Sequence, residues 1–178
     1  MSKISLTHKG NNIVLVGHMG SGKTSIGRNL SKKINYKLID IDEEIEKEVK
    51  MTISDFFINN REKEFRSLEE KIATKILMNN KESIVALGGG SFENKRIRDI
   101  VLNENFSIWL KCDLKTLVYR CNNRNTRPLL KDKNIRSEIS KLNKYRKKNY
   151  MKSNVIIDVS RKTRSSIIRE IISYLKYE

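Results

Sequence analysis

The sequence predicts an α/β fold, a three-layer α/β/α sandwich around a five-stranded parallel sheet. Short apolar runs recur along the 178 residues, and a helical pattern follows each run. This alternation is typical of parallel sheets that are covered by helices on both faces. A glycine-rich turn follows the first run, and neither a long linker nor an internal repeat divides the chain. We therefore expect residues 1–178 to form one domain with a sizeable core.

The predicted strands and helices alternate in order along the chain. Strands are expected at residues 12–16, 37–39, 83–87, 106–111 and 154–158. Helices are expected at residues 22–34, 43–50, 62–78, 93–102 and 113–120, then one that ends near residue 150 and one that begins at residue 163. A turn is expected to begin at Thr52, and Asp113 is a suitable N-cap for the helix after it. The apolar face of the 62–78 helix is marked by Leu68, Ile72, Ile76 and Leu77.

The net charge of +16 and the pI near 9.9 raise the question of a nucleic-acid partner. Lys is spread along the whole chain among Asn and Ile, and basic and aromatic residues are not interleaved as in base-stacking proteins. We therefore expect no nucleic-acid partner. Residues 120–148 are more basic than the rest, with only Asp132 and Glu138 opposing the cations, and an anionic small ligand accounts for this excess equally well.

The remaining composition indicates a soluble protein of the cytoplasm. Cys112 and Cys121 form no C-x-x-C pair, which favours a reducing compartment without disulfides or structural zinc. His8 and His18 have no carboxylate or cysteine at metal-ligand spacing. No apolar stretch approaches the roughly 20 residues that span a bilayer, and the polar start lacks the apolar core of a secretory signal.

The strongest motif is Gly17-His18-Met19-Gly20-Ser21-Gly22-Lys23-Thr24, which fits the P-loop pattern G-x-x-x-x-G-K-[ST]. The glycines allow backbone N–H groups to surround phosphate oxygens, and the next helix adds its positive N-terminal dipole. Lys23 is expected to reach the β and γ phosphates of ATP, and the Thr24 hydroxyl to bind Mg²⁺. The candidate nucleotide-binding residues here are Gly20, Ser21, Gly22, Lys23, Thr24 and Ser25.

Two carboxylates follow the second predicted strand. Asp40 and Asp42 lie at the edge where open α/β sheets bind ligands, and alternation along an extended chain points both the same way, opposite Ile41. One carboxylate can then support Mg²⁺ while the other orients or deprotonates an attacking hydroxyl. The sequence equally fits a helix N-terminus that carries acidic residues, which the helix dipole favours.

Two further features are candidates for the site. Gly88-Gly89-Gly90 follows the third strand, and three glycines in a row indicate a backbone that passes close to another group. This strand end lacks the Asp that many P-loop ATPases use for Mg²⁺, so Asp40 is the natural substitute. Arg127 lies in a polar segment, 122–133, that is suited to act as a lid carrying a guanidinium to the transferring phosphate.

The ordered set of motifs resembles the shikimate kinases, small relatives of the nucleoside monophosphate kinases, from Ile13 to about Asp158. The matching segments are the P-loop with Thr24-Ser25-Ile26-Gly27-Arg28, Asp40-x-Asp42 with Glu44-Ile45-Glu46, Glu64-Phe65-Arg66 with Glu69-Glu70, Gly88-Gly89-Gly90-Ser91, Arg127-Pro128-Leu129-Leu130, and Arg146 with Tyr150. Before this Tyr the family usually carries Pro-Leu, whereas this chain has Lys148-Asn149.

The resemblance implies transfer of the γ-phosphoryl of ATP to the 3-hydroxyl of shikimate, with Mg²⁺ as cofactor, by a monomer. Lys23, Asp42 and Arg127 would be catalytic, and Thr24 and Asp40 would hold the metal. Arg120 would lie against adenine, and a small helical region, 42–78, would bind the acceptor. Residues implied in shikimate binding are Asp42, Arg66, Gly88, Gly89, Gly90 and Arg146, with Ile53, Phe57 and Phe65 on the apolar side of the ring.

Two other functions remain open at this point. One is a kinase of the same architecture that phosphorylates gluconate or a nucleoside monophosphate. The paired Asp40 and Asp42, with Arg66 and Arg146, favour an acceptor that carries hydroxyls and a carboxylate. The other is a basic, non-enzymatic protein that binds RNA and uses a nucleotide as a switch.

Overall fold

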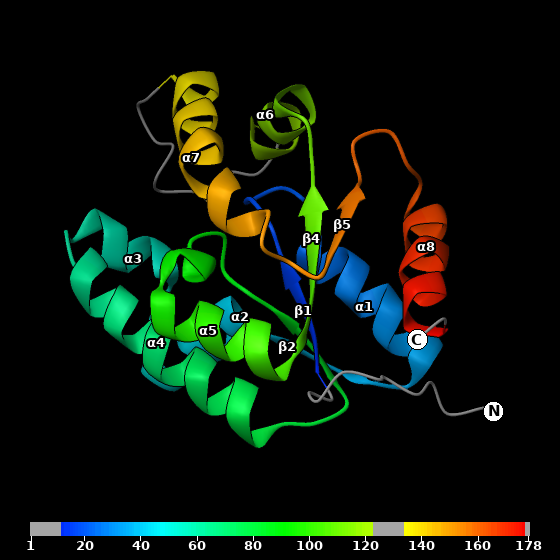
Figure 1. The fold of residues 1–178 in the computed structure, drawn as a ribbon. Helices are drawn as coiled ribbons and strands as arrows, with labels where there is room; N and C mark the ends of the chain where they lie inside the picture. The colour runs from blue at the N-terminus through cyan, green and yellow to red at the C-terminus, as the bar shows by residue number, and fades with distance from the viewer. Residues whose placement is uncertain (1–11, 123–133, 177–178) are drawn as a thin grey trace.

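The computed structural model describes residues 12–122 and 134–176 (Figure 1). The strands are β1 (Ile13–Val16), β2 (Lys37–Asp40), β3 (Ser83–Ala86), β4 (Phe106–Lys111) and β5 (Val155–Asp158). The helices are α1 (Lys23–Ile34), α2 (Ile41–Val49), α3 (Ile53–Ile58), α4 (Glu62–Asn79), α5 (Lys95–Glu104), α6 (Leu114–Asn122), α7 (Ile135–Tyr150) and α8 (Arg164–Lys176), with a 3₁₀ turn η1 (Ser91–Glu93).

All four strand pairs are parallel, and the strand order is β2-β3-β1-β4-β5. The central strand β1 therefore pairs with β3 on one side and β4 on the other. In an open sheet of this kind, the chain leaves neighbouring strands in opposite directions at such a point, and this opens a crevice at their carboxyl ends. The glycine-rich turn after β1 lies at that crevice.

The alternating side chains of the strands supply two cores, one on each face of the sheet. Ile13 and Leu15 face the core shared with α1 and α8, whereas Val14 and Val16 face the core shared with α2, α4 and α5. Figure 1 shows these helices on opposite sides of the sheet, with α6 and α7 beyond its carboxyl edge. The predicted α/β/α sandwich with a five-stranded parallel sheet is confirmed.

Several element boundaries differ from the sequence prediction for local reasons. The chain turns from β2 into α2 at Asp40, which caps the helix by accepting a hydrogen bond from the Asp42 N–H. Thr52 begins a short helix, α3, because Thr52 and Asp55 form a reciprocal capping box. After the third strand, η1 comes first and Asn94 caps α5.

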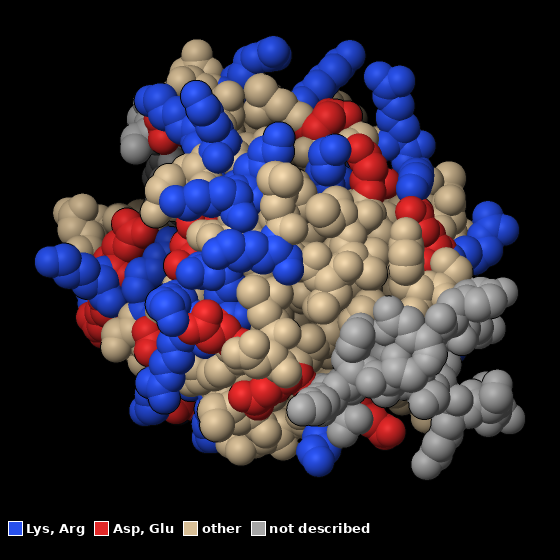
Figure 2. Space-filling view, in the orientation of Figure 1, with Lys and Arg blue, Asp and Glu red and all other residues tan. Residues whose placement is uncertain are grey.

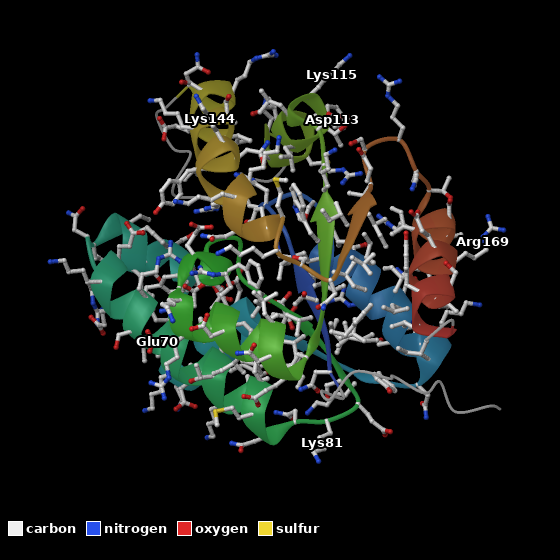
Figure 3. The ribbon with its side chains drawn as sticks, viewed as in Figure 1. Glu70, Lys81, Asp113, Lys115, Lys144 and Arg169 are labelled. Carbon is white, nitrogen blue, oxygen red and sulfur yellow. The ribbon has the colours of Figure 1, made fainter. Side chains whose placement is uncertain are left out.

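The buried face of α4 agrees with the prediction at Leu77 and is otherwise shifted. Phe65, Glu69, Ala73 and Leu77 form its buried stripe, while Leu68, Ile72 and Ile76 are only partly buried at its margin. The Asp113 cap is confirmed, since its Oδ1 accepts from the Thr116 N–H at 2.7 Å. Figure 3 shows Asp113 at the carboxyl end of β4. No helix among the described residues is both long and apolar enough to span a membrane.

Candidate active site

A cavity of about 870 Å³ lies at the carboxyl ends of the strands. Its walls come from the P-loop, the ends of β2 and β3, and parts of α3, α4, α6, α7 and α8. Figure 2 shows Lys and Arg over the upper and left parts of this face, with acidic side chains interspersed among them. A basic rim at the ligand edge of an α/β sheet is suited to anionic ligands.

The P-loop connects β1 to α1. Gly20 and Gly22 have φ values of 82° and 97°, in the region that side chains rarely adopt, so the turn requires glycine there. Lys23 folds its Nζ back over the loop, where it donates to the Gly17 carbonyl at 2.8 Å and the His18 carbonyl at 3.2 Å. Arg120 of α6 donates to the Gly20 carbonyl at 3.3 Å. The loop and two cations thus form one end of the cavity.

The acidic pair lies beside the P-loop, but its geometry differs from the predicted alternation. Asp40 ends β2, whereas Asp42 lies in the first turn of α2, so the second interpretation of the motif, an acidic helix N-terminus, also holds. The Thr24 hydroxyl donates to Asp40 Oδ2 at 2.6 Å. Burial, together with the nearby Asp40 and Glu69 carboxylates and against the opposing effect of Lys23, raises the pKa of Asp42 to about 7.

Arg66 on α4 is held by two acids and two aromatic rings. Its guanidinium donates to Glu69 Oε2 at 2.8 Å and to Glu62 Oε1 at 3.1 Å. It lies 5.1 Å from the ring centroid of Phe65 and 5.9 Å from that of Phe57. Such bracing leaves the guanidinium little freedom, which is the condition for preorganised binding of a carboxylate.

The glycine-rich loop after β3 passes against these side chains, as the three glycines predicted. A Cβ on Gly88 would lie 2.7 Å from Asp42 Oδ1 and 2.7 Å from Glu69 Oε1. A Cβ on Gly90 would lie 2.9 Å from Arg66 Nη1. The loop therefore has no room for larger residues where it meets α2 and α4.

Arg146 reaches the cavity from α7. The residue is only 5% exposed, and its Nη1 atom is buried with no hydrogen-bond partner among the described residues. Arg146 is therefore not a solvated surface cation, although most arginines of globular proteins are. The helix continues regularly through Lys148 and Asn149, and the Asn149 amide donates to Glu93 Oε2 at 2.9 Å.

The structure brings together most of the residues that the sequence singled out. Those that line the cavity are Gly20, Ser21, Gly22, Lys23, Thr24, Ser25, Asp40, Asp42, Ile53, Phe57, Phe65, Arg66, Gly88, Gly89, Gly90, Arg120 and Arg146. Arg127 and residues 123–133 of the predicted lid lie outside the described residues, while Asn122 ends α6.

Sequence reasoning missed several residues of the site. Glu69 is 2% exposed and connects Arg66 to the Ser91 hydroxyl, which donates to it at 2.6 Å. The family resemblance included Glu69, three residues after Arg66, but it was given no role, because a glutamate on a helix usually lies on the solvated face. Glu46 also lines the cavity, and its Oε1 accepts from the Ile53 N–H that begins α3. The cavity is also lined by Val159, Lys162, Arg164 and Ile167.

Comparison with known proteins shows the family of this chain. A family model described as shikimate kinase matches residues 19–176. A shikimate kinase of Bartonella henselae is 38% identical over 165 residues, which are 93% of this chain and 78% of the relative. One of Persephonella marina is 39% identical over 93% of this chain and 99% of the relative.

A solved structure agrees with the sequence comparisons. The structure of shikimate kinase from Acinetobacter baumannii in complex with shikimate matches this fold with a TM-score of 0.88 at 26% identity. The match covers 96% of this chain and 94% of that chain. With the P-loop, the acidic pair, Arg66 and the buried Arg146 in one cavity, these matches establish that the chain belongs to the shikimate kinase family.

Proposed function

We propose that this chain transfers the γ-phosphoryl of ATP to the 3-hydroxyl of shikimate, giving shikimate 3-phosphate and ADP. The observation that carries the proposal is the convergence of Asp42, Arg66 and Arg146 on the P-loop cavity in a member of the shikimate kinase family. Shikimate carries one carboxylate and several hydroxyls, so it needs cations at one end and an acceptor of hydrogen bonds at the other. Family membership, rather than the fold, favours shikimate over gluconate or a monophosphate.

The nucleotide would occupy the P-loop end of the cavity. Backbone N–H groups from Gly20 to Ser25 would surround the phosphates, and Lys23 would bridge the β and γ groups by exchanging its carbonyl partners for phosphate oxygens. Arg120, which already contacts the loop, would lie against adenine. In the same proposal, the guanidinium of Arg127 would stabilise the transferring phosphoryl, and residues 122–133 would close over it.

The residues beside the P-loop fit a magnesium ion. The Thr24 hydroxyl and the Asp40 carboxylate are 2.6 Å apart and supply the oxygen donors that Mg²⁺ prefers. No cluster of three or more His, Cys, Asp or Glu able to hold a metal occurs in the described part of the chain. This fits an ion bound by few protein groups plus substrate phosphates. When bound, Mg²⁺ would neutralise charge on the phosphates during transfer.

The acceptor would bind between the glycine-rich loop and the helices α4 and α7. Arg66 and Arg146 would bind the carboxylate of the acceptor. The backbone of Gly88, Gly89 and Gly90 would contact its hydroxyl side. The buried Nη1 of Arg146 supports this assignment, because it has no hydrogen-bond partner within residues 12–122 and 134–176, and a buried donor without a partner is costly unless a ligand satisfies it.

Asp42 would orient the 3-hydroxyl and accept its proton. As the hydroxyl oxygen bonds to the γ-phosphorus, the bond from that phosphorus to the bridging oxygen breaks and ADP leaves. Catalysis would therefore consist mostly of positioning and charge stabilisation by Lys23, Arg127 and the metal. We further propose that the chain acts as a single-domain monomer in the cytoplasm and has no nucleic-acid partner.

A coupled assay of ADP release tests the proposal. The enzyme is assayed with ATP, Mg²⁺ and one acceptor at a time, using shikimate, quinate, gluconate and nucleoside monophosphates. We expect ADP release to depend on shikimate and to be far slower with the other acceptors. A higher kcat/KM for gluconate or a monophosphate, or the absence of any acceptor dependence, would contradict it.

A further inference from the structure

Tyr150, the last residue of α7, is buried deep beside the cavity although no step of the proposed reaction uses it. It is 1% exposed. Its ring lies 5.6 Å from that of Trp109 and 6.3 Å from that of Phe92, centroid to centroid. A tyrosine in so apolar a setting costs free energy through its hydroxyl unless that hydroxyl has a specific partner.

That partner is the backbone of the glycine-rich loop. The Tyr150 hydroxyl donates to the Gly89 carbonyl oxygen at 2.6 Å. Burial raises the pKa of Tyr150 well above its usual value, against the lowering effects of the Arg146 charge and of a hydrogen bond between the Arg146 and Tyr150 side chains, so the hydroxyl remains a donor. The neighbouring carbonyls bond to the η1 turn instead. The Gly88 carbonyl accepts from the Ser91 N–H, and the Gly90 carbonyl accepts from the Glu93 N–H.

The bond to Tyr150 sets the orientation of a whole peptide unit. The Gly89 carbonyl and the Gly90 N–H belong to one rigid trans plane and point in opposite directions. Fixing the carbonyl toward Tyr150 therefore turns the Gly90 N–H away from it. A glycine peptide has few steric barriers to rotation, so this orientation needs an external anchor.

Gly89 has close neighbours on its other side as well. A Cβ at this position would lie 3.1 Å from the Met19 backbone nitrogen of the P-loop and 3.6 Å from Arg146 Nη1. Arg146 precedes Tyr150 by four residues, so both project from one face of α7. The loop that meets the acceptor is thus held between the P-loop and the helix that supplies Arg146.

We propose that Tyr150 is a positioning residue. It orients the Gly89–Gly90 peptide and fixes the position of that peptide relative to Arg146 for acceptor binding. The inference rests on the proposed function and adds to it a residue that touches neither substrate. Loss of the Tyr150 hydroxyl should weaken acceptor binding more than ATP binding. The phosphate-binding amides and Lys23 lie on the P-loop and do not depend on this hydroxyl.

Tyr150→Phe removes only the hydroxyl oxygen and retains the buried ring. In steady-state assays we expect the KM for shikimate to rise about tenfold, while the KM for ATP stays within twofold of wild type. The fluorescence of Trp109, the only tryptophan in the chain, provides a binding readout without turnover. The shikimate concentration at half-maximal signal should rise by the same factor.

Three further variants separate positioning from loss of stability. Tyr145→Phe makes the same chemical change on the same helix at a side chain that is 61% exposed, and it should leave both KM values unchanged. Asn12→Ala removes a buried hydrogen-bond network away from the cavity, so it should lower Tm without altering either KM. If Tyr150→Phe fails to fold, Gly89→Ala disturbs the same loop with Tyr150 intact and should raise the KM for shikimate by a larger factor than the KM for ATP, although its Cβ would also lie 3.1 Å from the Met19 nitrogen of the P-loop.

The outcomes are distinguishable from a failure of the proposed function. If wild type shows no shikimate-dependent turnover, the function itself is wrong. If wild type is active and Tyr150→Phe keeps its KM for shikimate within twofold, the positioning role is wrong. Equal rises in both KM values, or a shift matched by Asn12→Ala, would likewise assign Tyr150 a purely structural role.

Discussion

Replacing Gly90 with alanine adds one methyl group at the contact between the glycine-rich loop and Arg66. Gly90 has φ −108° and ψ −13°, a conformation open to alanine, so the substitution causes no backbone strain. The new Cβ would lie 2.9 Å from Arg66 Nη1 and 3.2 Å from Nη2. Its effect should therefore act entirely through the displacement of the guanidinium.

The size of the effect follows from how Arg66 is held. Ordinary contact distances are about 3.5 Å, so the guanidinium must retreat by roughly 0.5 Å. It cannot do so freely, because it donates to Glu69 and Glu62 and packs on Phe65. A charge-assisted hydrogen bond contributes about 1.5–3 kcal/mol, and each 1.4 kcal/mol is about tenfold in affinity. We expect the KM for shikimate to rise about 10- to 100-fold.

A double-mutant cycle in the ADP-release assay tests this reasoning. Gly90→Ala, Arg66→Ala and the double variant are compared at saturating ATP over a range of shikimate concentrations. If the methyl acts through Arg66, it should add little to the KM once the arginine is absent. Additive effects, or a KM for ATP that rises as much as that for shikimate, would refute the mechanism.

Four further outcomes are expected. Lys23→Ala should abolish almost all turnover, because in the proposed function this cation bridges the β and γ phosphates; activity within tenfold of wild type at saturating substrates would exclude that role. Arg146→Met should raise the KM for shikimate about 10- to 100-fold with an unchanged KM for ATP, and the reverse pattern would count against a carboxylate clamp. Asn12→Ala should lower the free energy of unfolding by about 2–3 kcal/mol, measured by urea denaturation, because the amide donates to Asn80 O and Asn105 Oδ1; an unchanged midpoint would contradict this. Burial raises the pKa of Cys112 to about 11, so at pH 8 its thiol should be protonated. A reagent that alkylates thiolates should therefore modify Cys112 only when the protein unfolds, as measured by mass spectrometry; rapid modification of the folded protein at Cys112 would contradict this.

The amino-acid sequence by itself determined the fold class and the nucleotide loop. Apolar runs alternating with helical patterns specify a parallel sheet covered on both faces, because each element must bury its own apolar face. The P-loop was equally accessible, since Gly20, Gly22, Lys23 and Thr24 are adjacent in the chain and their geometry is local. Local capping chemistry also identified Asp113, whose side chain bonds to an N–H three residues away.

Only the tertiary structure decided which charges are buried and which side chains meet. Glu69 and Arg146 look like surface charges along the sequence, yet packing of α4 and α7 against the glycine-rich loop removes both from water. Asp42 faces the cavity because it lies in the first turn of α2. The sequence had suggested that it would do so by alternation along an extended strand. The hydrogen bond from Tyr150 to Gly89 joins residues 61 positions apart. Contacts of this kind depend on how whole elements dock, and that docking is set by summed packing over many residues, which no local pattern in the sequence records.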